Sequence, residues 1–288
     1  MDRGTVAIIL VAAIAHAAWN LASKYKRGDT FLFVWAYTGA SALLCLPLGI
    51  LLSSDVSHIL SWHLVGASVA SGVLHLAYSL TLQAGYDRAE LGVVYPVARG
   101  TGPMLTMLTA VLLLHERPGW LAVVGALAVV AGILVVTGNP ARNKGMGGRA
   151  SRGVIWGAAT GLTIAAYTVW DAFAIKDLGL APESYYAGTL LVQCVLLAPG
   201  AVRRRRLLPD TLRKDRIPIV VVAVLSPLAY ILVLIAMRTA PVALVAPLRE
   251  SSIVVGSLVA WRLFRERDPA RRVVGAVVVL AGIVAISV

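Results

Sequence analysis

Charged side chains stand inside several of the most apolar stretches of this sequence. Arg99 and Arg249 lie 150 residues apart, and Asp171 and Glu250 are embedded in the same way. An Arg or Asp at the centre of a membrane helix costs about 2.5–3.5 kcal/mol, so Arg99, Arg249 and Asp171 would together cost about 8–10 kcal/mol if they faced lipid. These groups are therefore expected to face a wet cavity, one another or a ligand.

Three further patterns place polar side chains on single faces of apolar helices. Residues four apart share a helix face, and three polar pairs have this spacing: His16 with Asn20, Tyr95 with Arg99, and Tyr167 with Asp171. Three polar stripes on otherwise apolar helices predict one shared cavity. Because a guanidinium can bind a carboxylate or a phosphate through two parallel N–H groups, the arginines favour anion recognition.

The residue types suggest a role for each candidate. We expect Arg99 to bind the anion, with Arg249 as a second cationic residue. Asn20 and His75 are expected to form hydrogen bonds with the substrate. Aromatic side chains would shape the pocket: Trp19, Tyr78, Tyr95, Tyr167, Trp170 and Tyr230. The candidates for carrying a coupling proton are His16, Asp171 and Glu250, and Asp171 also suits a substrate ammonium.

A purely structural interpretation of the same residues stays open. Arg99 and Arg249 could be neutralised by Asp171 and Glu250 in ion pairs that never meet a substrate. His16 and His75 could be hydrogen-bonded groups between helices. Gln193 has no evident partner, so it receives no role.

Motifs of enzymatic chemistry are missing from the sequence. His115-Glu116 begins like the zinc motif H-E-x-x-H, but Gly119 occupies the place of the second histidine. The sequence has no G-x-S-x-G elbow, P-loop or C-x-x-C pair. We therefore expect no enzymatic activity, no cofactor and no metal.

The composition identifies the environment that must hold these residues. The chain has 288 residues, of which 59% are hydrophobic and 14% charged, with a mean hydropathy of +0.82. Soluble domains have about 45–50% apolar and about 25% charged residues. Since a bilayer core is crossed by about 20 apolar residues in a helix, the sequence predicts an all-α polytopic protein with ten transmembrane helices. The approximate spans are 5–24, 30–52, 62–85, 91–114, 118–137, 153–175, 184–202, 217–237, 242–261 and 270–288.

Two related halves make up the sequence. Residues 76–84 and 228–236 agree at six of nine positions, and so do residues 125–133 and 275–283. This predicts one five-helix repeat in residues 1–140 and another in 151–288. Because five is odd, the repeats must cross the membrane in opposite senses, which is a transporter plan with its site at the repeat interface near the midplane.

Proline and glycine interrupt the arginine-bearing spans at matching places. The fourth span reads Y-P-V-A-R-G-T-G-P over residues 95–103, and Pro247 precedes Arg249 by two residues. Proline removes a helical hydrogen bond. Interrupted segments in equivalent positions of two repeats are a sequence marker of a transporter site.

The basic residues are distributed unequally between the two ends of the spans. Of the 26 Lys and Arg residues, 20 lie in the odd-numbered connections and four in the even-numbered connections and the N-terminal stub. Positive residues stay inside, so this predicts odd-numbered connections in the cytoplasm and both termini outside. The net charge of +12 is thus assigned to topology and not to nucleic acid. Arg203–Arg206 would meet anionic lipid headgroups.

Both halves end in a pattern that resembles the EamA-type domain of the drug/metabolite transporter superfamily. The segments are L-L-H-E-R-P-G-W-L-A-V-V-G-A-L-A-V-V-A-G-I, residues 113–133, and L-F-R-E-R-D-P-A-R-R-V-V-G-A-V-V-V-L-A-G-I, residues 263–283. The family pattern of a glutamate followed by spaced glycines falls on Glu116, Gly125, Gly132, Glu266, Gly275 and Gly282. His115 and Arg265 stand where the family commonly has glycine. A capping role for Glu116 and Glu266 at the starts of their own helices is a sufficient explanation of the carboxylates.

The resemblance implies a ten-helix exporter or exchanger of small metabolites, often amino acids, with a cavity lined mainly by spans 1, 3, 4, 6, 8 and 9. Together with the residues, it favours a secondary transporter in the inner cell membrane, exporting a carboxylate-bearing metabolite by alternating access. Its partners would be the substrate, the lipid bilayer and a coupling proton, and it would be a monomer or a homodimer. Two alternatives remain: a carrier of phosphonate-like or organophosphate-like anions that uses both arginines, and a non-transporting sensor or assembly subunit.

Overall fold

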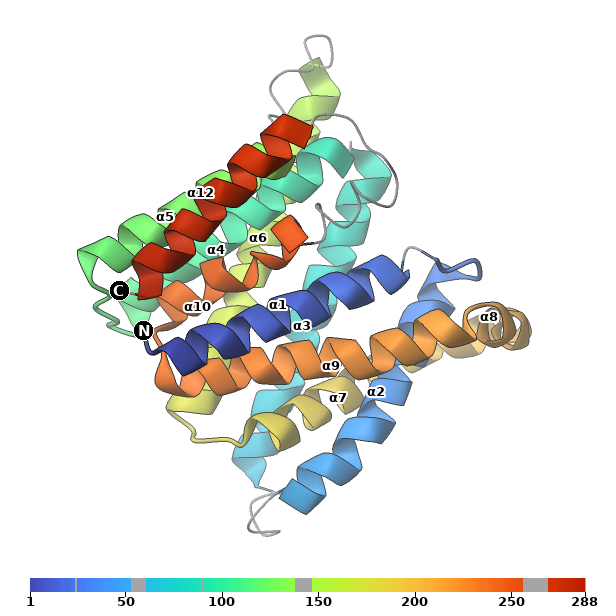
Figure 1. Ribbon diagram of the computed structural model, residues 1–288. Helices are drawn as coiled ribbons and strands as arrows, with labels where there is room; N and C mark the ends of the chain where they lie inside the picture. Colours follow the sequence, from blue (N-terminus) through green and yellow to red (C-terminus); the bar gives the residue numbers. More distant parts are fainter. Residues whose placement is uncertain (24, 53–60, 90, 138–146, 256–268, 288) are drawn as a thin grey trace.

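The computed structural model describes residues 1–23, 25–52, 61–89, 91–137, 147–255 and 269–287, and every regular element in these ranges is a helix (Figure 1). The helices of the first half are α1 (Arg3–Ser23), α2 (Thr30–Leu52), α3 (Trp62–Arg88), α4 (Leu91–Leu113) and α5 (Trp120–Thr137). Those of the second half are α6 (Gly147–Lys176), α7 (Pro182–Arg203), η3 (Arg205–Leu207), α8 (Leu208–Lys214), α9 (Arg216–Thr239), α10 (Val242–Arg249) and α12 (Pro269–Ser287).

Half of these helices are long and apolar enough to cross a membrane. Among the described residues six helices meet this condition: α1, α2, α3, α6, α7 and α9. Shorter apolar stretches cover Val97–Leu113, Trp120–Val135 and Val273–Ile286 in α4, α5 and α12. The prediction of an all-α polytopic membrane protein is confirmed.

The ninth predicted span is a broken helix. α10 ends at Arg249, the chain turns at Glu250 and Ser251, and helical conformation resumes at residues 252–255, where the described range stops. At the break the N–H of Glu250 donates to Pro247 O at 3.1 Å, and the N–H of Ser251 donates to Leu248 O at 3.1 Å. These are the tighter bonds of a 3₁₀ turn, and Pro247 contributes because its nitrogen has no hydrogen to donate. The fourth span, in contrast, is one continuous helix through Pro96 and Pro103.

Glycines at the crossing of α5 and α12 reveal the inverted symmetry of the repeats. A Cβ on Gly125 would lie 2.7 Å from Gly282 O, and one on Gly132 would lie 2.8 Å from Gly275 O. Because Gly125 corresponds to Gly275 and Gly132 to Gly282 in the repeat, exchanging the halves turns each of these contacts into the other. The two helices are therefore antiparallel and meet at a pseudo-two-fold axis. Small residues permit this close approach.

Several other helix pairs follow the same exchange. α1, α2, α3 and α4 correspond to α6, α7, α9 and α10. α1 packs against α9 as α6 packs against α3, and α2 packs against α9 as α7 packs against α3. The self-related pairs α2–α7 and α4–α10 are also in contact. Figure 1 shows the N- and C-terminus at the same side of the molecule.

Among the described residues, the larger of two hydrophobic clusters lies toward one side of the bundle. We call the side that carries the N-terminus, the end of α12 and the α4–α5, α6–α7 and α9–α10 connections the terminal face, and the opposite side the basic face. A large hydrophobic cluster surrounds Val6, Ile9, Ile175 and Met237 near the terminal face. Toward the basic face, a smaller cluster consists of Phe33, Ile219 and Val222.

The close crossing of α5 and α12 predicts a strong effect of one methyl group. Gly125→Ala would force the two backbones apart, so we expect a loss of about 1–3 kcal/mol in stability, measured as a lower melting temperature of the detergent-purified protein. Gly66→Ala is the matched control, because a Cβ there meets nothing within 4 Å. Equal melting temperatures of the two variants would refute the tight crossing.

Candidate functional site

A cavity of about 380 Å³ lies between the repeats. Its polar and aromatic lining comes from α1, α2, α3, α4, α6, α7, α9 and α10: His16, Trp19, Asn20, Tyr37, Thr38, Ser41, His75, Tyr78, Ser79, Arg99, Tyr167, Tyr186, Gln193, Ser226, Tyr230 and Arg249. Several of these are repeat equivalents, namely His16 with Tyr167, Tyr78 with Tyr230, and Arg99 with Arg249. The cavity therefore lies on the pseudo-two-fold axis, near the middle of the spans.

One end of the cavity is cationic. Arg99 Nη1 donates to Glu250 Oε2 at 2.7 Å, and Arg249 Nε donates to Glu250 Oε1 at 3.2 Å. Glu250 itself is buried and does not line the cavity. Two guanidinium groups share one carboxylate, so the cluster keeps one net positive charge. Arg249 Nη2 lies 3.2 Å from Glu250 Oε1, within ion-pair distance, but makes no hydrogen bond with the described residues.

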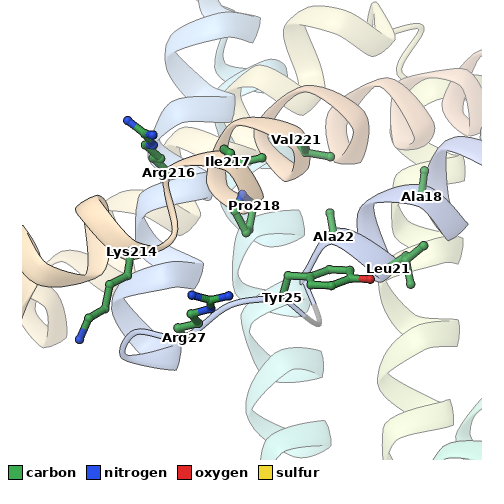
Figure 2. Close-up of a pocket in the computed structure, with 10 residues that line it drawn as sticks. All are labelled: Ala18, Leu21, Ala22, Tyr25, Arg27, Lys214, Arg216, Ile217, Pro218 and Val221. Atoms are coloured by element: carbon green, nitrogen blue, oxygen red, sulfur yellow. The ribbon is translucent and has the colours of Figure 1, made fainter. Parts of the chain in front are cut away.

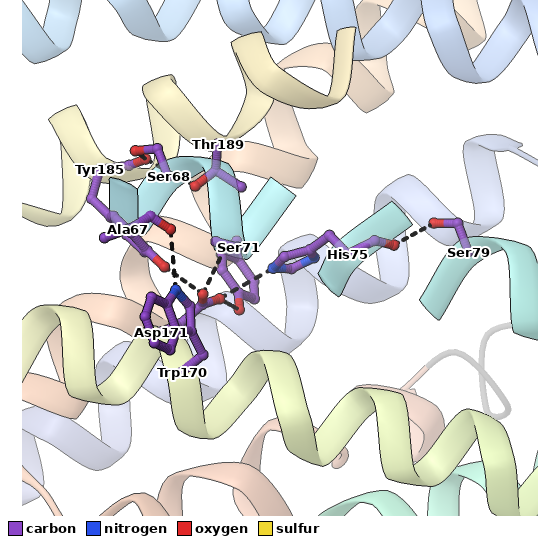
Figure 3. Close-up of polar contacts among 10 residues, drawn as sticks. Ala67, Ser68, Ser71, His75, Ser79, Trp170, Asp171, Tyr185 and Thr189 are labelled. Carbon is purple, nitrogen blue, oxygen red and sulfur yellow. Dashed lines mark hydrogen bonds and ion pairs between the residues drawn. The ribbon is translucent and has the colours of Figure 1, made fainter. Parts of the chain in front are cut away.

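A second buried cluster surrounds Asp171 in α6 (Figure 3). Its carboxylate is fully buried, and Oδ1 accepts from Ser71 Oγ at 2.7 Å and from Tyr185 OH at 2.6 Å. Oδ2 accepts from Tyr230 OH and lies 3.1 Å from His75 Nε2. A carboxylate can only accept, which assigns the proton to Nε2. Four donors from α3, α7 and α9 thus satisfy a charge that would otherwise be costly to bury.

Aromatic rings connect the two clusters. The His75 ring stacks on Tyr167 with centroids 4.2 Å apart, and the Arg249 guanidinium carbon lies 5.9 Å from the Tyr167 centroid. Tyr230 packs against the same histidine at 5.3 Å, with its ring centroid 6.4 Å from that of Tyr167, and in turn contacts Tyr186 at 4.7 Å. The cavity therefore has a cationic end, an aromatic wall and an end linked to Asp171 through His75 and Tyr230.

The structure brings most of the predicted site residues to this cavity. Those that line it are His16, Trp19, Asn20, His75, Tyr78, Arg99, Tyr167, Tyr230 and Arg249. Asp171 and Glu250 lie behind the wall as partners of lining residues. Trp170 is directed elsewhere and donates its indole N–H to Ala67 O at 3.1 Å. The side chain of Tyr95 lies outside the described residues.

The ion-pair interpretation holds for only part of the predicted set. Both arginines contact Glu250, whereas Asp171 is paired with His75 and no arginine. Asn20 donates to the carbonyl of His16 in its own helix at 2.8 Å, which leaves its side-chain oxygen toward the cavity.

Two lining helices were not expected, because the predicted wall omitted spans 2 and 7. α2 contributes Tyr37, Thr38 and Ser41, and Ser41 lies four residues after Tyr37 and three after Thr38, which puts it on one face with both. α7 contributes Tyr186 and Gln193. Both groups are visible in the sequence as polar residues at helical spacing, but hydroxyl groups are common in membrane helices.

Glu116 has a different role from the expected cap of its own helix. Its carboxylate accepts the backbone N–H groups of Val242 and Ala243, at 2.8 and 2.9 Å, which begin α10 in the other repeat. Lys176, at the end of α6, donates to the same carboxylate at 2.6 Å. Glu116 therefore joins three elements at the terminal face, including the helix that carries Arg249, and complements the positive end of α10. Glu266, its repeat equivalent, lies outside the described residues.

The backbone of the preceding residue, His115, explains why the family commonly has glycine at this position. His115 has a φ of 52°, in the left-handed region that glycine adopts without a steric penalty. The turn that aims Glu116 at α10 therefore has the backbone that a glycine would favour.

Comparison with known proteins decides the family. The sequence matches the model of the EamA-like transporter family twice, over residues 3–138 and 151–288. The chain belongs to the EamA-like transporter family. No curated protein matches the sequence. A crystal structure of a protein with 18% sequence identity superposes with a TM-score of 0.79, over 99% of this chain and 96% of that chain.

Membership in the EamA-like family fixes the general activity. The chain is a transporter of the drug/metabolite type, not an enzyme, with a small-molecule substrate and a membrane setting. The solved relative is too distant in sequence to identify a substrate, so its likeness establishes the fold. The two EamA domains correspond to the two repeats that exchange in the helix contacts.

The Asp171 cluster predicts a large cost for one isosteric change. Asp171→Asn replaces an acceptor with an amide that presents N–H groups to donors, so about 3–5 kcal/mol of stability should be lost. Asp177→Asn, in an exposed residue just after α6, is the control. Thermal unfolding in detergent measures both, and a normal melting temperature for Asp171→Asn would contradict the four-donor arrangement. Ser71→Ala should cause a smaller decrease.

Glu116→Gln should loosen the terminal face. A glutamine loses the charge that Lys176 contacts and cannot accept both N–H groups of α10, so we expect a loss of about 1.5–3 kcal/mol, the range for hydrogen bonds to charged groups. Asp210→Asn removes the exposed pair with Lys214 instead and should have almost no effect. If both variants melt like the parent protein, Glu116 does not tie the repeats together.

Proposed function

We propose that this EamA-family transporter exports a small carboxylate-bearing metabolite, such as an amino acid, as a secondary transporter. The observation that carries the proposal is the uneven charge of the cavity. Arg99 and Arg249 share the single carboxylate of Glu250 beside the cavity wall. One unbalanced positive charge in a low-dielectric site favours one carboxylate.

The hydrogen-bond donors at the wall support the same ligand. Arg249 Nη2 and Trp19 Nε1 are buried and make no hydrogen bond with the described residues, although Nη2 lies 3.2 Å from Glu250 Oε1, and both side chains line the cavity. Arg99 already donates to Glu250 at 2.7 Å. We therefore assign carboxylate binding chiefly to Arg249, with Arg99 holding Glu250 in place.

The opposite end of the cavity suits an ammonium group and a coupling proton. His75 and Tyr230 line the cavity and both contact the Asp171 carboxylate, so they connect the cavity to the buried acid. Glu250 is already shared by two arginines, which makes Asp171 the better proton candidate of the two acids. His16, which also lines the cavity, is the second candidate. The tyrosines between the ends would contact an apolar side chain.

The phosphonate alternative receives less support from this geometry. A doubly charged phosphonate would use two free guanidinium groups, whereas Glu250 offsets one of the two positive charges here. A monocarboxylate matches the remaining charge.

The packing supports alternating access. The large hydrophobic cluster and the Glu116 contacts close the terminal half of the bundle, while the smaller cluster of the described residues lies in the basic half. Transport would then require α10 to part from Glu116 while the repeats rock about the pseudo-two-fold axis. The orientation predicted from the charge count would make the terminal face the external one.

Flux in proteoliposomes tests the proposal. Arg249→Gln removes the donor to the substrate but leaves the Arg99–Glu250 pair intact, so the protein should fold. We expect amino acid efflux at subsaturating concentration to fall about 10–100-fold, the equivalent of a charged hydrogen bond of 1.5–3 kcal/mol. Arg213→Gln, an exposed arginine in α8, should transport like the parent protein.

Competition during the same assay separates the two substrate classes. Unlabelled amino acids should inhibit flux, and alkylphosphonates should not. Inhibition by phosphonates alone would overturn the carboxylate assignment, and parental flux in Arg249→Gln for every substrate would remove Arg249 from the site.

A further inference from the structure

A groove of about 550 Å³ lies on the outside of the bundle, where α1 ends and α9 begins, and takes no part in the cavity described above. Its lining comes from both repeats: Ala18, Leu21, Ala22, Tyr25, Arg27, Lys214, Arg216, Ile217, Pro218 and Val221. The position at the start of α9 and the end of α1 puts it at the basic face, at the level where spans leave the membrane.

The groove is divided into an apolar and a cationic end (Figure 2). Arg27, Lys214 and Arg216 lie toward one end, with the Arg216 side chain directed away from the other two, and Ala18, Leu21, Ala22 and Val221 lie at the other. The apolar residues belong to the spans themselves, and the cationic residues lie at or beyond their ends. Tyr25 lies between the two ends with 55% of its surface exposed. This order along the membrane normal is that of a phospholipid, with its chain toward the bilayer core and its phosphate at the surface.

The acidic residues beside the cationic end of the groove do not form ion pairs with its two arginines in the part of the chain that the structure describes. Asp215 is fully buried and accepts the backbone N–H groups of Arg27 and Gly28 at 2.7 and 2.9 Å. Lys214 is paired with Asp210 at 2.8 Å. Among the described residues, neither Arg27 nor Arg216 has a carboxylate within ion-pair distance, so two positive charges remain available.

We propose that this groove is a binding site for one acidic phospholipid. The phosphate contacts Arg27, the exposed side chain of Arg216 turns toward it when the lipid binds, and an acyl chain covers the apolar floor between Ala18 and Val221. Charge complementarity selects an acidic lipid over a zwitterionic one. An acidic headgroup keeps a net negative charge that can balance the two guanidinium groups, whereas the phosphate of a zwitterionic headgroup is already balanced by its own cation. The lipid bridges α1 of the first repeat and α9 of the second, so it stabilises the contact between the repeats at the basic face.

Thermal unfolding of the full chain in detergent, with added lipid, tests the site. Phosphatidylglycerol should raise the melting temperature of the parent protein, because a ligand of the folded state stabilises it. Phosphatidylcholine with the same chains should raise it much less, and glycerol phosphate, which lacks the chain, not at all. Equal stabilisation by both lipids would overturn the proposal in favour of ordinary annular lipid, and equal stabilisation by glycerol phosphate would reduce the site to a phosphate site.

Two variants locate the effect. Arg27→Gln with Arg216→Gln should abolish at least half of the shift caused by phosphatidylglycerol. Arg205→Gln with Arg206→Gln is the charge-matched control, since both arginines are exposed on the same face and do not line the groove. If the control loses as much of the shift as the groove variant, the lipid responds to total surface charge and the site does not exist.

The proposed contact of an acyl chain with the apolar end of the groove can be tested separately. Ala18→Phe would fill the apolar end without changing any charge, and the exposed position of Ala18 makes it tolerant of a larger side chain. The melting temperature without lipid reports folding. The shift with phosphatidylglycerol should fall in this variant, and a full shift would show that no acyl chain occupies the floor.

Discussion

A bilayer core offers no water to solvate a buried charge. Every ionised group within the membrane spans of this chain must therefore be balanced by other protein groups or by the substrate. Glu250 meets this constraint by contacting Arg99 of one repeat and Arg249 of its own. On a continuous helix the side chains at 249 and 250 would diverge by about 100°. The break after α10 places them within 3.2 Å instead. The break, the shared carboxylate and the positive end of the cavity are thus consequences of one requirement.

Divergence between the repeats gives the cavity its two ends. The symmetric frame repeats Tyr78 as Tyr230 and Arg99 as Arg249, and the α5–α12 glycines keep the halves in register. The two acidic residues beside the cavity, in contrast, both belong to the second repeat. Asp171 corresponds to Asn20 in the first repeat, and Glu250 corresponds to Gly100. A symmetric scaffold therefore holds an asymmetric charge distribution, which is what a substrate with two different ends requires.

The sequence was sufficient to predict the helical class, the repeat and most of the residues of the cavity wall. The high cost of a charged side chain in the bilayer core and the spacing of residues on a helix face are strong constraints. Partners were harder to predict. Asp171 was expected to meet a ligand or an arginine, and instead four donors from three helices enclose it, of which Ser71 and Tyr185 look like ordinary membrane residues in the sequence. Glu116 was expected to cap the helix that follows it, but tertiary packing brings α10 closer. Such choices depend on which helices are neighbours in space, which local spacing does not encode.

The tie formed by Glu116 has a consequence for the carrier when it is empty. Uncovering the terminal face requires a carboxylate that is only 9% exposed to give up Lys176 and two backbone donors at once. Without a bound substrate nothing compensates for the loss of these contacts, so the unloaded protein should rest with the terminal face closed. In the proposed transport cycle, this would limit leakage of substrate through the empty carrier.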